Sequence, residues 1–519
     1  MTSVWERDLD EAGIVRLAEL LALRLKVGSL IALKGELGTG KTTLARATIQ
    51  ALLEHEVEVP SPTFSLAQAY ATPRLLVTHF DFYRLADAQE AAELGFEDAL
   101  EHGAVIAEWP DRIAALLPED RYEIELAEGS TAGRRRIVLR GLGGLSTDVE
   151  RLGASWRLLE RTPQTLKARI RYLQGDASTR TYARLTQARQ TVLMMDAPRQ
   201  ADGPPIRDGK SYSQLAHLAE DMVRPFAAIT GVLRGAGLSA PAILASDLEH
   251  GLLLVEDLGD RLFAAEIAAG TPQRELYQGA VDVLLSLRAL PVPARLPLPD
   301  GSSYALPRRD RAAFEIELEL LLDWYWPALR GAPCPEPVRA QFRELWSRIL
   351  DELLQLPGAW FLRDFHSPNL IWLPERQGLA RVGILDFQDA LNEHLAFDLV
   401  SLLQDARLDV AAELERQLLD YYCALARDRE PGFDRGGFER AYAMFGAQRN
   451  TRLLGLWVRL LRRDGKAHYL KHIPRTWGYL ARNLRHPALA QLAAWYARHF
   501  PPSLRDWRPA ERGRDRGGE

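Results

Sequence analysis

Cysteine is nearly absent from this 519-residue chain, which has only Cys334 and Cys423. Neither has a second cysteine nearby or a histidine at metal-ligand spacing, so neither a disulfide framework nor a zinc site is indicated. The sequence also lacks a run of about 18 apolar residues, which a membrane-spanning helix requires. Its start, "MTSVWERDLDEAG", is acidic, whereas a signal peptide is basic and then apolar. We therefore expect a cytoplasmic protein that is not associated with a membrane.

An excess of positive charge is missing as well, since the formal net charge is -5. A protein that binds the nucleic-acid backbone by neutralising many phosphates needs clustered lysine and arginine. Any role in nucleic-acid metabolism should therefore be indirect. Apolar residues make up 47% and charged residues 26%, which is typical of a globular protein. The length favours two or more domains.

The first part of the chain alternates between helical and strand patterns. Residues 12–25 have the apolar spacing of an amphipathic helix, 29–35 form an apolar strand pattern, and 41–53 are helical again. Further strand patterns follow at 74–81, 103–109, 122–127 and 134–140. This order predicts an α/β domain over residues 1–142. The glycine-rich segment "GLGGLSTD" (141–148) then interrupts both the helical and the strand spacing of apolar residues, so we expect a linker over 143–156.

The second part follows a different pattern over residues 157–506. Strand patterns occur at "LVEDLG" and "VGILDF", and the region beyond Glu393 is almost continuously helical. A small mixed part followed by a larger helical part is the outline of a two-lobed α+β protein-kinase-like domain. The last residues, 507–519, are charged, contain glycine and have few apolar side chains, which predicts a disordered tail.

A phosphate-binding loop is predicted near the start of the chain. "GELGTGKT" matches G-x-x-x-x-G-K-[ST] and has a strand before it and a helix after it, as this motif requires. The glycines let main-chain N–H groups point at phosphate oxygens, and Lys41 should neutralise the β- and γ-phosphates. Thr42 should place its hydroxyl on Mg²⁺. The nucleotide-binding set is Gly35, Glu36, Leu37, Gly38, Thr39, Gly40, Lys41, Thr42 and Thr43.

Three further motifs fall where they could serve this nucleotide. "SPTFSL" is a polar turn that includes Thr63, and "HFDFYRL" and "AEWPDR" end strands with Asp81 and Glu108. Carboxylates at strand ends beside a phosphate-binding loop can hold Mg²⁺ or orient an attacking water. Each residue alone is more often a solvated loop residue. Their order along the chain favours the functional interpretation.

"GELGTGKTT", "SPTF", "HFDFYR", "LGFEDAL" and "AEWPDR" together resemble the TsaE family of small ATPases, over about residues 1–140. The resemblance implies that Thr63 lies in a switch-like loop and that Asp81, Glu108 and Trp109 belong to the active-site face, with Glu108 also near the metal. It further implies slow ATP hydrolysis. The implied partners are the proteins of the threonylcarbamoyl-transferase complex, which modifies adenosine 37 of tRNA, so tRNA itself is reached only indirectly.

A second site is indicated by "FLRDFHSPNL" and "VGILDFQDA". Phosphoryl transfer from ATP to an alcohol needs a carboxylate that accepts the hydroxyl proton and oxygen ligands that hold Mg²⁺ against the phosphates. Asp364, Asn369 and Asp386 occur in that order. Alone, Asp364 would be a turn cap and Asp386 a strand end. The three in sequence favour a catalytic base and two metal ligands.

The nucleotide side of this second site is expected upstream. "LQGDASTRTYARL" (173–185) has the small residues of a hairpin that covers phosphates, among them Ser178. "LLLVEDLG" (252–259) would be the hinge strand beside adenine, although an apolar run that ends in acids is an ordinary strand end.

"GDASTRTYAR", "MMDAP", "LVEDLGD", "RDFHSPNL" and "LDFQDA" resemble the aminoglycoside phosphotransferase-like kinases, and most of all the anomeric amino-sugar kinases of the AmgK type. The resemblance covers about residues 157–505. It implies that ATP phosphorylates the 1-hydroxyl of N-acetylmuramate or N-acetylglucosamine in cell-wall recycling, with Asp364 as base and Asn369 and Asp386 on Mg²⁺. The whole chain is then an α/β P-loop NTPase domain followed by an aminoglycoside phosphotransferase-like domain, a bifunctional protein.

One departure leaves other interpretations open. Kinases of this superfamily usually carry a lysine on the third strand, but Met194 and Met195 stand there, so Arg180 or Arg184 could supply the charge. The second domain could also act on an aminoglycoside or choline, or be a non-catalytic pseudokinase that regulates the ATPase. "LLDWYWP" (321–327) is assigned to core packing, and the basic stretch 462–475 to a solvated helix end that could also meet an anionic substrate.

Overall fold

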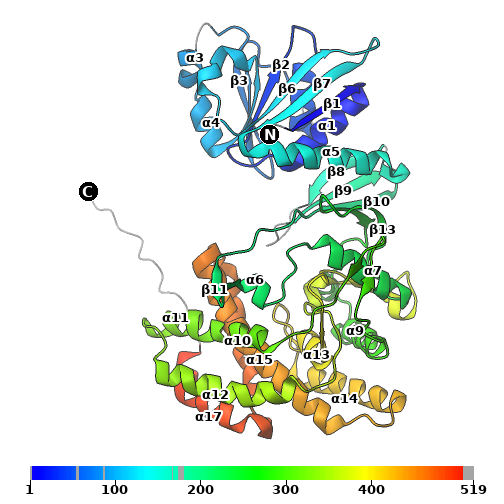
Figure 1. Ribbon diagram of the computed structural model, residues 1–519, viewed down its shortest axis with the longest axis vertical. Helices are drawn as coiled ribbons and strands as arrows, with labels where there is room; N and C mark the ends of the chain where they lie inside the picture. Colours follow the sequence, from blue (N-terminus) through cyan, green and yellow to red (C-terminus); the bar gives the residue numbers. More distant parts are fainter. Residues whose placement is uncertain (1–2, 54–57, 86–87, 166, 174–179, 506–519) are drawn as a thin grey trace. The chain divides into compact units, whose positions relative to one another are not determined.

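The computed structural model describes residues 3–53, 58–85, 88–165, 167–173 and 180–505 (Figure 1). The tail predicted over 507–519 lies outside these residues. The chain divides into two compact units. The first contains residues 1–198 together with 243–257, and the second contains 199–242 together with 258–519. The phosphate-binding loop therefore lies in the first unit, and Asp364, Asn369 and Asp386 lie in the second.

A seven-stranded mixed sheet forms the centre of the first 142 residues, with the strand order β1-β7-β6-β2-β5-β4-β3. Its strands are β1 (Val4–Leu9), β2 (Leu30–Lys34), β3 (Ala67–Ala71), β4 (Leu76–Asp81), β5 (Gly103–Glu108), β6 (Arg121–Glu128) and β7 (Arg135–Leu142). The four central strands are parallel to one another, with β4 next to β5, β5 next to β2, and β2 next to β6. The α/β prediction is confirmed, and β1 and β3 add antiparallel strands that the apolar pattern did not reveal.

Helices cover both faces of this sheet, because its central strands are apolar on both sides. One face packs on α1 (Glu11–Arg24) and α2 (Lys41–Leu52), through residues such as Ile31 and Ile106. The other face packs on α3 (Ala88–Glu93), α4 (Phe96–His102) and the 3₁₀ turn Pro110–Leu116. The sheet thus holds the carboxyl ends of β2, β4 and β5 at one edge, where the phosphate-binding loop begins.

A second sheet of five strands belongs to the same unit. Its order is β13-β14-β10-β9-β8, and all its neighbours are antiparallel. The strands are β8 (Arg169–Leu173), β9 (Thr181–Gln187), β10 (Gln190–Asp196), β13 (Ile243–Asp247) and β14 (Leu252–Glu256). This is the small mixed part that the sequence predicts after residue 157.

Helix α5 (Ser146–Glu160) joins the two sheets into one hydrophobic core. Leu152, Trp156 and Leu159 are buried in a cluster that also contains Ile170 and Met194 of the five-stranded sheet. Val149 and residues 152–156, 158 and 159 of this helix are buried, while Glu150, Arg157 and Glu160 are exposed. The residues 143–156 that we expect to link two domains therefore form a short 3₁₀ turn and most of this packed helix (Figure 1).

Ion pairs reinforce the contact between the two sheets. Asp196 is the last residue of β10, and one of its carboxylate oxygens lies 3.2 Å from a guanidinium nitrogen of Arg24 in α1. Asp196 also forms an ion pair with Arg151 of α5. Trp5 of β1 and Trp156 of α5 pack edge to face with ring centroids 5.2 Å apart. Because these groups are largely buried, the P-loop part and the five-stranded sheet are expected to unfold together.

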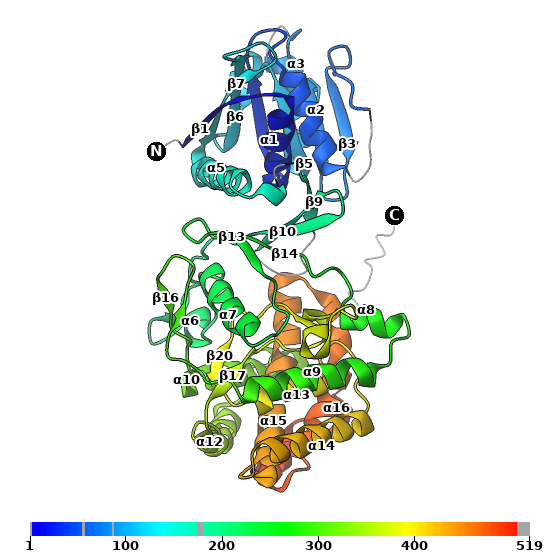
Figure 2. The same ribbon diagram turned by 90° about the vertical axis from the view of Figure 1, so that its right-hand side faces the viewer.

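The second unit is mostly helical, as predicted (Figure 2). Its longer helices are α7 (Val223–Gly235), α9 (Gln273–Arg288), α10 (Arg311–Leu320), α12 (Glu336–Leu353), α13 (Ala396–Leu403), α14 (Ala412–Arg429), α15 (Arg435–Asp464), α16 (Ile473–Asn483) and α17 (Ala490–His499). Short elements complete it: α6 (Tyr212–Leu215), α8 (Phe263–Ala268), α11 (Trp326–Arg330), β11 (Pro205–Arg207), β12 (Lys210–Ser211), β15 (Leu296–Pro297), β16 (Ser303–Tyr304), β17 (Ala359–Phe361), β18 (Leu370–Trp372), β19 (Val382–Ile384) and β20 (Leu391–Glu393).

Two short two-stranded sheets in this unit carry the second candidate site. Strand β17 pairs with β20, and β18 pairs with β19, all antiparallel. The aromatic group "LLDWYWP" lies elsewhere, in the π-helical turn Leu321–Tyr325 and the start of α11, where Tyr325 and Trp326 are buried against Phe500. Its assignment to the core is therefore confirmed. No helix among the described residues has the length and apolar character needed to cross a membrane.

Candidate active sites

The phosphate-binding loop connects β2 to α2 and has the left-handed backbone that glycine permits. Gly35, Gly38 and Gly40 have φ angles of 138°, 82° and 100°. A Cβ atom at Gly35 would lie 2.3 Å from the main-chain oxygen of Leu126, so only glycine fits there. The loop ends at the N-terminus of α2, where free N–H groups and the helix dipole favour an anion.

Lys41, the first residue of α2, folds back over this loop. Its Nζ donates to the main-chain oxygens of Gly35 and Glu36, both at 2.8 Å, and lies 3.9 Å from the centroid of the Trp109 ring. Burial lowers the pKa of Lys41, while the carboxylates of Glu108 and Asp81 act in the opposite direction. The ammonium group is thus held against the phosphate-binding loop.

Glu108 ends β5 and lies beside the loop. Its two oxygens are used separately: Thr42 Oγ1 donates to one at 3.0 Å, and His79 Nε2 lies 3.0 Å from the other. Both Glu108 and His79 are buried. The motif "HFDFYRL" contains His79, but sequence reasoning singled out only its aspartate, because a lone histidine in a strand carries no specific signal.

Asp81 ends the neighbouring strand β4, and its Cα is in register with that of Glu108. One of its carboxylate oxygens accepts the hydroxyl of Thr63 at 3.2 Å, and the other accepts the N–H of Tyr83 at 3.0 Å. Thr63 is therefore tied to the acid at the strand end. The hydroxyl of Thr42 and the carboxylates of Asp81 and Glu108 are oxygen groups of the type that Mg²⁺ prefers, so these residues fit such an ion.

The second site begins after β17, in the loop that holds Asp364. The preceding residue, Arg363, has a φ angle of 71°, which is rare outside glycine and turns the chain sharply. The buried carboxylate of Asp398 accepts the N–H groups of Leu362 and Arg363 at 2.6 and 3.0 Å. Burial raises the pKa of Asp398 to about 8, against the effect of these two donors. Asp398 thus fixes the turn that presents Asp364.

The three residues expected to act together do converge. The amide nitrogen of Asn369 donates to the main-chain oxygen of Asp364 at 3.0 Å and lies 3.4 Å from a carboxylate oxygen of Asp386. The strands behind them are paired, and the N–H of Leu385 donates to the oxygen of Asn369 at 2.9 Å. Asp386 itself has a φ angle of 58°. The loop of the expected base and the two expected metal ligands therefore lie together.

Gln388 and Asp389 extend this cluster, although sequence reasoning did not single them out. The amide of Gln388 donates to Asp386 at 3.1 Å and to Asp389 at 3.3 Å. Burial raises the pKa of Asp389, and the nearby carboxylates of Asp364 and Asp386 raise it further. A cation would relieve this concentration of negative charge. Carboxylate and amide oxygens also match the ligand preference of Mg²⁺, so the residues fit that ion.

The residues expected on the nucleotide side lie in the first unit. Ser178 falls outside the described residues, and Arg180 is the first described residue after that gap. Met194 and Met195 are both buried, and neither offers a charge. The Nε atom of Arg184 lies 2.7 Å from Asp257, so its guanidinium already has an acidic partner next to the expected hinge. Its role as a substitute for the lysine stays a prediction.

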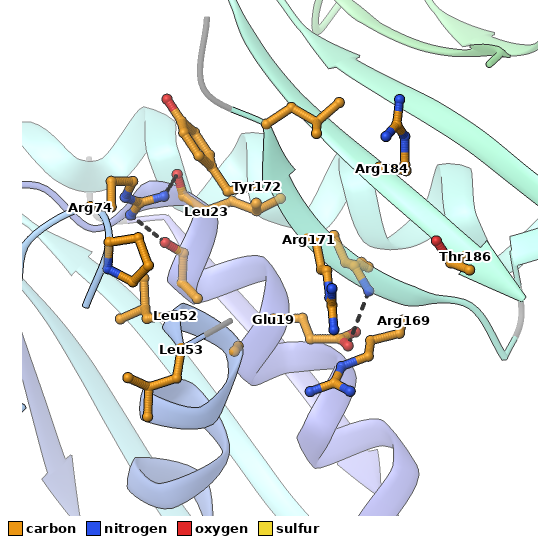
Figure 3. Close-up of a pocket in the computed structure, with 15 residues that line it drawn as sticks. Glu19, Leu23, Leu52, Leu53, Arg74, Arg169, Arg171, Tyr172, Arg184 and Thr186 are labelled. Atoms are coloured by element: carbon orange, nitrogen blue, oxygen red, sulfur yellow. Dashed lines mark hydrogen bonds between the residues drawn. The ribbon is translucent and has the colours of Figure 1, made fainter. Parts of the chain in front are cut away.

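A hollow of about 710 Å³ lies in the first unit, between α1 and the end of α2 on one side and the five-stranded sheet on the other (Figure 3). It follows the outer edge of β8 and is bounded on the other side by α1 and the end of α2. Glu19 of α1 accepts the N–H of Ile170 at 3.1 Å, and Arg74 donates to main-chain oxygens at the end of α1. The free edge of the small sheet is thereby covered.

Two family models match the chain. Residues 9–137 match the model described as threonylcarbamoyl adenosine biosynthesis protein TsaE. Residues 169–436 match the phosphotransferase enzyme family. The two matched ranges include the phosphate-binding loop and the Asp364 loop, respectively.

Curated relatives agree with this division. An N-acetylmuramate/N-acetylglucosamine kinase of Caulobacter vibrioides is 41% identical over 341 residues, which cover 64% of this chain and 92% of that protein. A kinase of the same name from Pseudomonas aeruginosa is 31% identical and covers 61% of this chain and 85% of its own length. A tRNA threonylcarbamoyladenosine biosynthesis protein TsaE of Rickettsia felis is 40% identical over 117 residues, 22% of this chain and 68% of that protein.

Proposed function

The chain belongs to the TsaE family through its N-terminal part and to the phosphotransferase enzyme family through its C-terminal part, and we propose that it runs two separate ATP-dependent reactions. That it is an ATP-using enzyme follows from both memberships. The proposal concerns the two substrates, the residues in each site, and the presence of both activities in one protein.

For the C-terminal site, we propose phosphorylation of the anomeric hydroxyl of N-acetylmuramate or N-acetylglucosamine. Asp364 accepts the proton of the sugar 1-hydroxyl, while the oxygen of that hydroxyl forms a bond to the γ-phosphorus of ATP. The bond between that phosphorus and the bridging oxygen breaks, and ADP leaves. Asn369 and Asp386 would hold Mg²⁺, which neutralises the phosphate oxygens when bound.

The convergence of Asn369, Asp386 and the Asp364 loop is the single observation that carries this proposal. A coupled assay for ADP, run with a panel of acceptors, tests it. We expect turnover with the two amino sugars and none with aminoglycosides or choline. The assay needs the Lys41→Ala variant, because hydrolysis at the first site would otherwise obscure the signal. Turnover only with a cationic acceptor would refute the proposal.

For the N-terminal site, we propose slow ATP hydrolysis in support of tRNA threonylcarbamoyladenosine formation at position 37. Lys41 would neutralise the β- and γ-phosphates, and Thr42 and Glu108 would hold Mg²⁺. Asp81, tied to Thr63, would orient the attacking water. The partners are the threonylcarbamoyl-transferase proteins, and tRNA is engaged only through them. Stimulation of ATP hydrolysis by that purified complex is the test, and an unchanged rate would refute it.

We further propose that the kinase serves cell-wall recycling, so that the two activities belong to different pathways. The domain limits are proposed as residues 1–142 for the ATPase and 157–506 for the kinase. Helix α5, which packs against both sheets of the first unit, then belongs to the interface between the two. The fusion keeps two catalytic sites on one polypeptide without a shared reaction.

A further inference from the structure

Helix α15 carries several arginines toward the second site. Arg449, Arg452 and Arg459 are spaced by three and seven residues, which places them on one face of the helix. Arg449 and Arg452 are both within electrostatic reach of Asp364. The proposed base therefore has cationic neighbours on the side formed by α15.

Three arginines on this side share one buried carboxylate, and the carboxylate of Asp364 also favours the charged form of Arg452. Glu317 of α10 lies 3.2 Å from Arg363 and 3.8 Å from Arg452, and it is also paired with Arg309. Burial would raise the pKa of Glu317, but the three guanidinium groups lower it to about 2. One carboxylate thus faces three cations, and the contact with Arg452 is the longest and most exposed of the three.

Arg459 lies two helical turns further along α15 and has even less compensation. Its guanidinium carbon lies 4.4 Å from the ring centroid of Tyr212 in α6. It makes no ion pair with any residue in the described part of the chain, and burial lowers its pKa. The hydroxyl of Tyr212 interacts with both Arg452 and Arg459. An anion at this point would satisfy both arginines.

Two of the arginines near the end of α15 and beyond it are, in contrast, already paired. Arg463 binds Asp464 at 2.7 Å, and Arg475 is paired with Asp409. The basic stretch 462–475 therefore offers less to an anionic substrate than the sequence alone suggests. Arg459, which lies earlier on the same helix, has no such ion pair among the described residues.

The two proposed acceptors differ in one group, and that group could bind to the arginines of α15. N-acetylmuramate is N-acetylglucosamine with a lactyl ether, whose carboxylate projects from the sugar ring away from the anomeric hydroxyl. With that hydroxyl at Asp364, the carboxylate is directed across the ring toward the surrounding protein. A guanidinium group is well suited to bind it, because it can donate two parallel hydrogen bonds.

We propose that Arg452 and Arg459, with Tyr212 between them, form a carboxylate subsite that makes N-acetylmuramate the preferred acceptor. This inference rests on the proposed kinase function. The subsite selects an acidic sugar and disfavours polycationic acceptors, which the same arginines would repel. Arg459 is a specificity residue rather than a catalytic one, because it lies away from the reacting hydroxyl.

The test compares kcat/KM for the two sugars in the Lys41→Ala protein and in the same protein with Arg459→Gln, Arg459→Lys or Arg452→Gln. Because charge-assisted hydrogen bonds are lost, the ratio of kcat/KM for N-acetylmuramate to that for N-acetylglucosamine should fall roughly tenfold to hundredfold in Arg459→Gln. The change should arise mainly in KM for N-acetylmuramate, and Arg459→Lys should restore part of it. Arg463→Gln, on the same helix, is the matched control and should leave the ratio unaltered.

Each outcome decides one point. An unchanged ratio in Arg459→Gln, or an equal loss with both sugars, would overturn the subsite. If Arg452→Gln fails to fold because Glu317 loses a partner, Arg459→Gln still decides, since Arg459 is outside that buried network. A Lys41→Ala protein that binds ATP but phosphorylates neither sugar would instead overturn the proposed kinase function, and the subsite with it.

Discussion

The amide nitrogen of Asn369 lies 3.4 Å from a carboxylate oxygen of Asp386, although the two residues are 17 positions apart along the chain. The same amide also donates to the main-chain oxygen of Asp364. One side chain thus connects the loop of the proposed base to the loop of the proposed metal ligand. This contact makes the second site specific enough to test by single substitutions.

Removal of the base should abolish sugar phosphorylation without loss of ATP binding. In Asp364→Asn, the amide cannot accept the hydroxyl proton, so kcat should fall by roughly 10² to 10⁴. Sugar-dependent ADP release in the Lys41→Ala background measures this. Asp351→Asn, which changes an exposed carboxylate on α12, is the matched control. Full activity in Asp364→Asn would show that another group is the base.

Removal of the Thr42 hydroxyl should stop ATP hydrolysis at the first site. Thr42 donates to Glu108 at 3.0 Å and has the position expected for a metal-binding hydroxyl. In an Asp364→Asn background, where the kinase is silent, Thr42→Ala should lower the hydrolysis rate on the order of 10²-fold. Thr42→Ser keeps the hydroxyl and should remain active. Equal rates in the two variants would contradict the assignment.

Glu19 should make the first unit less stable as the pH rises. Burial raises the pKa of Glu19 to about 7, while the N–H of Ile170 and the guanidinium of Arg16 lower it. The folded state therefore holds a proton that the unfolded chain releases near pH 4.5, so stability falls between about pH 4.5 and 7 and is level above that range. Since each tenfold change in proton affinity is worth about 1.4 kcal/mol, the decline should be roughly 3 kcal/mol.

Urea unfolding of the wild type and Glu19→Gln across this pH range measures the effect. The glutamine can still accept the N–H of Ile170 but does not titrate, so the difference in unfolding free energy should change with pH and then become constant above about pH 7. Parallel pH profiles for the two proteins would contradict the assignment.

The ion pairs of Asp196 should stabilise both sheets of the first unit together. Asp196→Ala leaves Arg24 and Arg151 without their acidic partner in a largely buried place, which should cost roughly 2 to 4 kcal/mol. The exposed pair of Glu6 with Arg136 is the control, and Glu6→Ala should leave the unfolding free energy nearly unchanged. Equal unfolding free energies for the two variants would show that the two sheets are not joined through Asp196.

The sequence predicts local features of this protein better than remote ones. The phosphate-binding loop and the order of Asp364, Asn369 and Asp386 are readable because each motif needs particular residue types at a fixed spacing. Asp398 holds the turn before Asp364 by accepting the N–H of Arg363, which lies 35 positions earlier in the chain. This role cannot be predicted from the sequence, because one buried aspartate in a helix has no local signature. The same holds for His79 and for Arg459.

The region around α5 shows a second limit. Glycines at 141, 143 and 144 suggest a break in the fold, and the backbone does turn there, with Gly143 at a φ angle of 59°. The helix that follows is nevertheless buried, because Trp5, Ile170 and other residues far apart in sequence pack around it. A pattern of local breaks therefore marks a turn but does not establish that the parts on either side are independent.

The kinase assignment is tested most directly by ³¹P NMR of the product formed from ATP, Mg²⁺ and N-acetylmuramate with the Lys41→Ala protein. We predict a sugar 1-phosphate whose phosphorus couples to the anomeric proton, and no such signal with Lys41→Ala/Asp364→Asn. A phosphate ester at another hydroxyl, or the same product from the protein without Asp364, would contradict the mechanism.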